Sequence, residues 1–393
     1  MKSILVSTGL RYDKIALIED NKLMDYYIDD HNKSNTADNI YMGIVKDSVK
    51  KYDSVFIDLG LDKNAYMSSD NTDKLPLVGS KVLVQVIKDD TDTKGVSVSK
   101  NLSLVGRYSV LIINYTGKNK PKNKIMFSND FDKSKIDDIR KALNDIDLDS
   151  NMGVIVRTES ENISNSLLKD DIKNLCKLYE NIMKEFESFS STKEDKKPRL
   201  VYKKDITDVI INEFYDKSIS KIICDKDKTA KMVKEKMDMY KLDSSKVETF
   251  EEKTLSLFDT FKVDSEVKKA LGRYAWLKSG GQIIIDHTEA MTVIDVNSTK
   301  CEGKKEIESS SFKVNMEAAY EIARQIRLRN ISGIIIVDFI NMKEEEHKKE
   351  LLKALKEYTK EDKIKVNIVG MTNLGLVEMT RQKKRKMLKD IIK

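Results

Sequence analysis

Two aspartates that each end a run of branched apolar residues are the side chains in this sequence best suited to chemistry. Asp295 ends the run in MTVIDVNST, and Asp338 ends the run in SGIIIVDFINM. A strand that is apolar on both faces is usually buried, and an ionised carboxylate there is costly unless a cation binds it. The alternation of strand side chains puts Asp295 and Asn297 on one face, so the amide can orient the carboxylate. The pattern predicts a metal site.

The segment between the two aspartates predicts a helix that connects their strands. Apolar residues recur there at helical spacing, at Phe312, Met316, Ala319, Ala323 and Ile326. A strand, crossover helix and strand form a unit that brings two strand ends together. One aspartate alone is more simply a solvated strand end or a helix cap. Two in matched settings, followed by arginines, favour a hard cation that faces an anionic substrate.

The bulk composition bounds the answer without identifying a partner. The 393 residues suggest about two to four domains. The net charge is only +6, from 71 basic and 65 acidic residues, so local clusters decide whether phosphates are bound. The densest basic cluster is expected on one helical stretch, either as a solvated face or as a phosphate-binding surface. Its members are Arg381, Lys383, Lys384, Arg385, Lys386 and Lys389.

Cysteine and histidine usage argues against zinc and against an oxidising compartment. The cysteines have no paired spacing; they are Cys176, Cys224 and Cys301. The histidines are equally scattered, which favours surface or supporting positions; they are His31, His287 and His347. No apolar run approaches the roughly 20 residues of a membrane span, and the N-terminus does not resemble a signal peptide. We expect a cytoplasmic protein that does not associate with membranes.

Three long stretches resemble the catalytic core of the bacterial ribonuclease E/G family. They are WLKSGGQIIIDHTEAMTVIDVNS, FKVNMEAAYEIARQIRLRNISGIIIVDFINM and NLGLVEMTRQKKRK. The resemblance implies that Asp295 and Asp338 bind magnesium for RNA hydrolysis, with Asn297 as a nearby hydrogen-bonding partner. It also implies 5′-phosphate and 3′-hydroxyl products from single-stranded, A/U-rich RNA, in messenger decay and in ribosomal or transfer RNA maturation.

Residues 39 to 104 contain closely spaced strand patterns with glycine turns, which predict a small closed barrel of the OB type. Such barrels bind single strands by stacking bases on aromatics beside basic groups. The available side chains are Tyr41, Phe56, Tyr66, Lys63 and Lys94. Strand aromatics are more often core, but the barrel context favours Phe56 and Tyr66. NIYMGIV, FIDLGLDKNAYM and KGVSVS resemble the RNA-binding barrel of the family, which implies that Phe56, Tyr66 and Lys94 contact RNA.

The strand pattern GVIVRT ends in Arg157 and Thr158, which offer a guanidinium fork and a hydroxyl to a phosphate. Such a pair is weak evidence by itself. The resemblance implies that Arg157 and Thr158 sense a 5′-monophosphate, and that backbone around Gly106 and Val110 receives the terminal base. A helix with one apolar side is predicted to follow, over about residues 166 to 186.

The resemblance implies a multidomain α/β fold. An RNase H-like subdomain, formed by residues 1–37 and 198–262, receives two insertions: an OB-fold barrel over 38–104 and a 5′-sensor region over 105–197. A DNase-I-like catalytic domain follows over 263–393, and its first helix is expected to run from Val263 to the glycines at 280–281.

Several alternatives remain open at this point. The two-cysteine zinc-sharing motif that follows EMTR in the family is absent, so no zinc is expected, and assembly through another surface or a monomer are both open. Glu289 is considered as a third metal ligand, although a turn or surface carboxylate is the simpler interpretation. A non-catalytic single-stranded RNA-binding protein is the main rival, and the two aspartates argue against it. Processing of DNA by the same metal chemistry is also open, because no reader of the 2′-hydroxyl is visible in the sequence.

Overall fold

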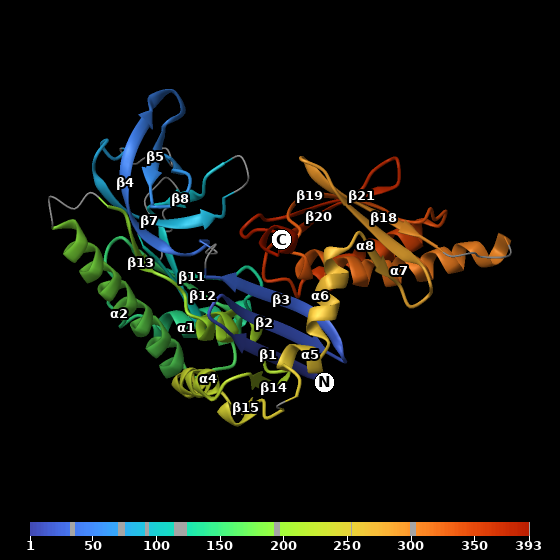
Figure 1. The fold of residues 1–393 in the computed structure, drawn as a ribbon, viewed down its shortest axis with the longest axis horizontal. Helices are drawn as coiled ribbons and strands as arrows, with labels where there is room; N and C mark the ends of the chain where they lie inside the picture. The colour runs from blue at the N-terminus through green and yellow to red at the C-terminus, as the bar shows by residue number, and fades with distance from the viewer. Residues whose placement is uncertain are drawn as a thin grey trace. The chain divides into compact units, whose positions relative to one another are not determined.

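The structure is a computed structural model that describes residues 1–31, 36–69, 75–90, 94–113, 124–191, 197–252, 254–298 and 304–392 (Figure 1). The chain forms two compact units, each built from segments that are distant in sequence. The first contains residues 1–35, 216–231 and 245–393, and the second contains residues 36–215 and 232–244. Helix α4 (Asp227–Met239) contributes residues to both. Cys301 lies outside the described residues.

The first sheet of the first unit has the strand order β15-β14-β1-β2-β3. Strand β1 pairs in parallel with β14 and antiparallel with β2, as Figure 1 shows for the blue strands. The N-terminal strands therefore obtain their neighbour from a segment more than two hundred residues later in the chain. The bounds are β1 (Lys2–Thr8), β2 (Tyr12–Glu19), β3 (Lys22–Asp30), β14 (Ile219–Cys224) and β15 (Val247–Thr249).

The second sheet of this unit has the order β16-β17-β18-β19-β21-β20. Only β18 and β19 pair in parallel, and the predicted crossover helix α7 connects them. The strands are β16 (Tyr274–Trp276), β17 (Gln282–His287), β18 (Met291–Asn297), β19 (Gly333–Asp338), β20 (Val366–Met371) and β21 (Leu376–Arg381). The helices of the unit are α5 (Leu257–Thr260), α6 (Val263–Leu271), α7 (Lys304–Leu328), α8 (Glu345–Thr359) and α9 (Leu388–Ile391).

One face of this second sheet packs against α7 and α8. Ile294 and Val337 point into that core with Ile322 of α7 and Leu355 of α8, and all four are fully buried. Because strand side chains alternate, Asp295 and Asp338 point to the opposite face. That opposite face is more exposed to solvent, as the 48% exposure of Ile334 illustrates. The sheet thus separates an apolar core from an accessible surface.

Two expectations about this unit are wrong. The helix from Val263 ends at Leu271, because Gly272 is extended and residues 274–276 pair with β17 as an edge strand. The C-terminal basic residues do not share one helix. Arg381 ends β21, is buried, and forms a two-point ion pair with Asp362 at 2.7 and 3.1 Å. Of that cluster only Lys389 lies in α9.

The second unit contains a closed barrel. Strand pairs run in the order β4-β5-β6-β8-β7, and an additional β4–β7 pairing closes the circle, while β13 extends β4. This confirms the predicted small closed barrel, which has five strands in an OB-like arrangement. Tyr41 is only 5% exposed and belongs to the barrel core, so it cannot serve as a stacking platform. The bounds are β4 (Ile40–Val49), β5 (Ser54–Asp58), β6 (Ala65–Ser68), β7 (Lys81–Lys88), β8 (Ser97–Ser99) and β13 (Arg199–Tyr202).

A four-stranded sheet of order β11-β12-β10-β9 follows the barrel. Its strands are β9 (Leu102–Val105), β10 (Ser109–Ile113), β11 (Ile125–Phe127) and β12 (Met152–Val156). The helices of the unit are α1 (Ile136–Ala142), α2 (Asn165–Ser190) and α3 (Ile206–Val209), and α2 buries Leu168, Ile172, Leu175 and Ile182 as its apolar pattern predicts. No helix within the described ranges is long and apolar enough to cross a membrane. The predicted domain boundaries and the RNase H-like and DNase-I-like descriptions stay predictions.

Candidate active site and RNA-binding surfaces

Asp295 and Asp338 lie directly opposite one another at the ends of two adjacent parallel strands. They are paired residues in the register of β18 and β19. Adjacent strands are about 4.8 Å apart, so the two carboxylates project side by side from the accessible face. Asp295 is half-buried and Asp338 is exposed. The sequence therefore predicted which two side chains the fold brings together.

The surroundings of this pair leave its negative charge uncompensated. The Asn297 amide donates a hydrogen bond to Oδ2 of Asp295 at 2.7 Å, which fixes the orientation of that carboxylate. Gly281 supports Asn297 from behind, because a Cβ there would approach the Asn297 carbonyl to 2.8 Å. Within the described part of the chain, neither aspartate forms an ion pair. Two adjacent carboxylates without a cation repel each other, so the arrangement favours a bound cation.

The protein supplies few metal ligands at this position. Across the residues that the structure describes, no three His, Cys, Asp or Glu side chains are grouped to hold an ion. Glu289 is exposed in the turn before β18, at the opposite end of that strand from Asp295, so it is a turn carboxylate. Two carboxylates that leave room for water and substrate oxygens suit Mg²⁺, which keeps several waters and takes few protein ligands.

A cavity of about 340 Å³ opens beside Asp338. Its polar lining includes Asn341, Lys348, Thr372 and Asn373, which come from the loops after β19 and β20 and from α8. The Lys348 ammonium is paired with Glu345 at 2.7 Å, so the lining offers mainly amide and hydroxyl groups next to one of the two aspartates. Such a lining is suited to a polar ligand rather than to an apolar one.

Two exposed aromatics share the accessible face with the aspartates, and the sequence analysis did not identify them. Tyr274 is aligned with Ile284 of β17, which is in turn aligned with Asp295, so the three residues form one row across the sheet. Trp276 lies in the next row with Asn297 and is 70% exposed. These aromatics were not recognised because residues 274–276 were predicted to be helical. Their alternation of exposed and buried side chains fits an edge strand.

The barrel brings its predicted aromatics together. Phe56 and Tyr66 are paired residues on β5 and β6, with ring centroids 6.0 Å apart and an edge-on angle of 63°. Phe56 is half-buried, and Tyr66 is 38% exposed. Lys94 is exposed, and the next residue, Gly95, packs closely against Asn64, the residue before β6: a Cβ on Gly95 would lie 2.2 Å from the Asn64 carbonyl oxygen. These positions fit a small platform for stacking with a neighbouring cation.

The predicted sensor residues also meet, but they are already paired with other groups. Nη1 of Arg157 donates to the Gly106 carbonyl at 2.8 Å, and Nη2 donates to Glu159 at 3.0 Å and to the Asn212 carbonyl at 3.3 Å. The Thr158 hydroxyl donates to the other Glu159 oxygen at 3.3 Å. A carboxylate therefore occupies both groups that were expected to hold a phosphate. This contact of Glu159 was not predicted from the sequence.

The backbone near this cluster is rigid. The Gly106 N–H donates to the Ser109 carbonyl, and a Cβ on Gly106 would collide with the Asp171 carboxylate at 2.6 Å. Asp171 is buried, which raises its pKa, and it accepts hydrogen bonds from the Ser109 hydroxyl and the Tyr108 N–H. Val110 is half-buried and continues β10 beside this turn. These contacts hold the backbone of the turn in one conformation next to Arg157.

Comparison with known proteins places the chain in a family. The sequence model described as "Ribonuclease E/G family" matches residues 103–384, which is well over half of the chain. The chain belongs to the ribonuclease E/G family. It is 30% identical to "Ribonuclease G" of Haemophilus influenzae over 410 residues, which cover 99% of this chain and 81% of that protein. It is 28% identical to "Ribonuclease G" of Escherichia coli over 416 residues, with the same two coverages.

"Ribonuclease E" of Escherichia coli is 28% identical over 406 residues, which cover 98% of this chain but only 37% of that longer protein. The family resemblance is therefore confirmed, and so is the assignment to a family of ribonucleases. Residues 103–384 of this ribonuclease E/G family member include Asp295, Asp338, Arg157 and Thr158. The roles of individual residues stay predictions.

Proposed function

We propose that this protein is a magnesium-dependent endoribonuclease that cleaves single-stranded RNA in RNA processing and messenger decay. The observation that carries the proposal is the alignment of Asp295 with Asp338 on adjacent parallel strands, on an accessible face and without an ion-pair partner among the described residues. A protein that only bound RNA would lose affinity through two uncompensated carboxylates, because phosphates repel them. A bound divalent cation converts this repulsion into attraction.

The chain's own groups have separate roles in the proposal. Asp295 and Asp338 hold the cation, and the Asn297 amide keeps the Asp295 carboxylate in one orientation through its 2.7 Å hydrogen bond. When bound, the cation supplies Lewis acidity that polarises the scissile phosphate and acidifies a water for in-line attack. Both aspartates fit this donor set, because Mg²⁺ prefers oxygen ligands. We infer products with a 5′-phosphate and a 3′-hydroxyl.

RNA capture is proposed for two aromatic surfaces. Phe56 and Tyr66 would stack bases on the barrel, with Lys94 contacting the backbone. On the face of the aspartates, Trp276 and Tyr274 offer exposed rings on an edge strand, two strands away from Asp295. Two strand spacings correspond to about 10 Å, a distance that one or two nucleotides can span. Single-stranded substrates suit both surfaces, because their bases are free to stack.

We also propose that Arg157 and Thr158 recognise a 5′-monophosphate, with a modest effect on cleavage. An arriving phosphate must displace Glu159 from both residues. The free energy gained from the phosphate contact is therefore reduced by the cost of breaking the contacts with Glu159. The family's end recognition would therefore be weaker in this chain than in a member whose arginine is not paired.

The deciding experiment incubates the purified protein with a single-stranded RNA that carries a 5′-monophosphate, with magnesium and with a chelator. We expect internal cleavage only with magnesium, and mapping of the fragments should find 5′-phosphate and 3′-hydroxyl ends. Ends with a 2′,3′-cyclic phosphate would contradict the water-attack mechanism. Binding without cleavage under all divalent cations would favour the rival function of a non-catalytic RNA-binding protein.

A further inference from the structure

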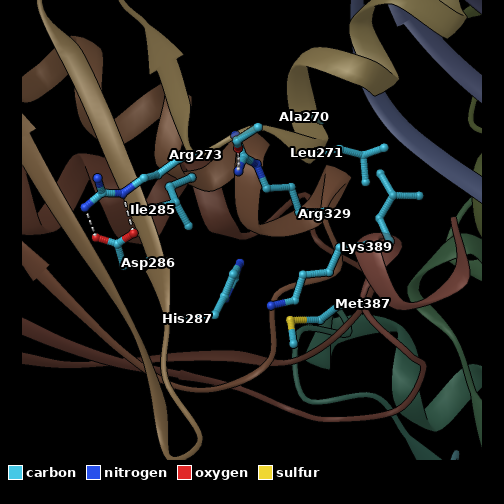
Figure 2. Close-up of a pocket in the computed structure, with 11 residues that line it drawn as sticks. Ala270, Leu271, Arg273, Ile285, Asp286, His287, Arg329, Met387 and Lys389 are labelled. Carbon is cyan, nitrogen blue, oxygen red and sulfur yellow. Dashed lines mark hydrogen bonds and ion pairs between the residues drawn. The ribbon is translucent and has the colours of Figure 1, made fainter. Parts of the chain in front are cut away.

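A second cavity of the first unit lies away from the proposed active site. It has a volume of about 310 Å³ and is formed by the end of α6, the end of β17, the residue after α7 and the start of α9 (Figure 2). Its polar lining consists of Arg273, Asp286, His287, Arg329 and Lys389. Asp295 is at the opposite end of β18 and on the opposite face from His287, so this cavity is a separate site.

Arg329 is the most informative group in the cavity wall. It is only 6% exposed, and its Nε and Nη1 donate at 2.5 Å to neutral oxygens, the Gln325 amide and the Gly272 carbonyl. Nη2 has no hydrogen-bond partner among the described residues, and no carboxylate is within ion-pair distance. Burial lowers the pKa of this arginine to about 10, so the guanidinium stays charged at neutral pH. A buried, unpaired cation is costly, and an anion in the adjacent cavity would offset that cost.

The other charges around the cavity add to the positive potential. Lys389 is exposed and forms no hydrogen bond or ion pair within the described residues, and Figure 2 shows its amine reaching toward the His287 ring. Asp286, the one carboxylate among the described residues that line the cavity, is already neutralised by Arg273 through two hydrogen bonds of 2.6 Å, drawn as dashed lines in Figure 2. The cavity therefore has an excess of positive charge from Arg329 and Lys389.

His287 reports on this potential. Its Nδ1 is hydrogen-bonded to the Thr292 hydroxyl at 3.0 Å. Burial lowers the pKa of His287, and the charges of Lys389 and Arg329 lower it further, while Asp390 and Asp286 act in the opposite direction. An anion placed among these groups would reverse the effect of the two cations and raise the pKa.

We propose that this cavity binds a phosphate group, held by Lys389 and by the positive field of Arg329, with His287 as an additional donor. A phosphate has the charge, the size and the number of acceptor oxygens to serve several such donors at once. The group can come from the RNA backbone or from a small phosphorylated molecule. The proposal does not require nuclease activity, because it concerns a site on the other face of the sheet.

The test follows the three histidines by NMR while inorganic phosphate is added in the absence of divalent cations. We expect the pKa of His287 to rise, and those of His31 and His347 to remain constant as internal controls. Lys389→Gln should weaken phosphate binding by roughly tenfold or more, the scale of a lost charge-assisted contact. Lys383→Gln, an equal charge change on an exposed residue of the same segment outside the cavity, should leave it unchanged.

A second measurement distinguishes the two sources of phosphate. If the ligand is RNA backbone, Lys389→Gln should weaken binding of a 5′-hydroxyl RNA and reduce the slope of its salt dependence by about one, whereas Lys383→Gln should not. If RNA binding is equal in the two variants while phosphate binding differs, the ligand is a small phosphorylated molecule. Phosphate binding that is equal in Lys389→Gln and the unaltered protein, or a His287 pKa that does not respond, would overturn the proposal. Repeating the titration with Asp338→Asn separates this outcome from failure of the proposed nuclease activity.

Discussion

The aspartate pair and the arginine–threonine pair are both predicted phosphate-handling sites, yet they differ in how far their side chains are already committed. Asp338 has no polar partner within the described residues, and Asp295 has only the Asn297 amide. Arg157 and Thr158, in contrast, both donate to Glu159. In the proposed function, the charge of the first site is compensated only when a cation binds. The second is satisfied within the fold, so a ligand must compete with an internal carboxylate.

This difference predicts that the two sites respond differently to substitution. An uncompensated pair at strand ends is destabilising in the absence of a ligand, and such arrangements persist where function requires them. A ligand that displaces an internal ion pair leaves the displaced charge uncompensated, which reduces the net gain from binding. We therefore expect substitutions at the aspartates to affect turnover strongly, and substitutions at the sensor cluster to affect substrate preference moderately.

The largest effect should come from Asp338→Asn or Asp295→Asn. Each removes half of the charge that holds the cation, so the cleavage rate should fall by at least about a hundredfold, the scale on which loss of one charge-stabilising group acts. Without divalent cations, neither RNA affinity nor thermal stability should fall, because loss of one carboxylate relieves the repulsion within the pair and against phosphates. Glu350→Gln, which neutralises an exposed carboxylate on α8, is the matched control and should cleave at the unaltered rate. An aspartate variant that cleaves RNA at the unaltered rate would contradict the proposed role of this pair.

Asn297→Ala should produce a smaller loss of the same kind. The amide orients Asp295 without itself carrying charge, and loss of such a supporting hydrogen bond typically costs roughly tenfold to a hundredfold in metal affinity or activity. The magnesium concentration that gives half-maximal cleavage should rise, and excess magnesium should restore part of the rate. If Asn297→Ala lowers the rate equally at all magnesium concentrations, the amide does not act through the cation.

Substitution of the barrel aromatics should affect capture and leave chemistry intact. Phe56→Ala and Tyr66→Ala should each weaken binding of single-stranded RNA by about 1 to 3 kcal/mol, the value of one stacked base. KM should rise while kcat is retained. Tyr41→Phe keeps the buried ring and serves as a control that should bind normally. Unfolding of Phe56→Ala, without a separable binding defect, would show that Phe56 is a core residue.

The smallest effect is expected at Glu159. Glu159→Gln removes the charge that holds Arg157 and Thr158, so the preference for 5′-monophosphorylated over 5′-hydroxyl RNA should increase severalfold, up to roughly tenfold. Arg157→Ala should abolish any preference and spare cleavage of circular RNA. The measurement is the ratio of kcat/KM for the two RNAs, with Glu185→Gln on α2 as the exposed control. An unchanged ratio in Glu159→Gln would refute the idea that this carboxylate competes with the phosphate.

The sequence predicted best where local periodicity and strand register coincide. The aspartate strands and the crossover helix follow from alternation and helical spacing alone, so Asp295, Asp338 and Asn297 were identified correctly as neighbours. The sequence failed where a glycine interrupts a helix-like pattern. Helix α6 ends before Gly272, and residues 274–276 then pair with β17. Pairing with the edge of the sheet, rather than local helix propensity, determines the structure of these residues.

Charged residues were harder to interpret than apolar ones. In the sequence, Arg381 belongs to a run of basic residues that is typical of a surface. In the structure its side chain is only 3% exposed and is paired with Asp362, which lies outside that run. The contact of Glu159 with Arg157 and Thr158 was likewise not predicted from the sequence. Pairing between charges depends on geometry that periodicity does not encode, so these contacts required the structure.

The interrupted first sheet has a consequence for how this chain folds. Strand β1 pairs with β14, which is synthesised about 210 residues later. The barrel strands β4, β5 and β6, in contrast, pair with strands that are close to them in the sequence. Closing so long a loop carries a large entropic cost, and contacts of that range form slowly. We expect the barrel to fold during synthesis while the N-terminal hairpin exposes an unpaired edge, available to chaperones or to other chains. Pulse-labelled hydrogen exchange during refolding should find amides of β4 and β5 protected before those shared by β1 and β14, and simultaneous protection would contradict this order.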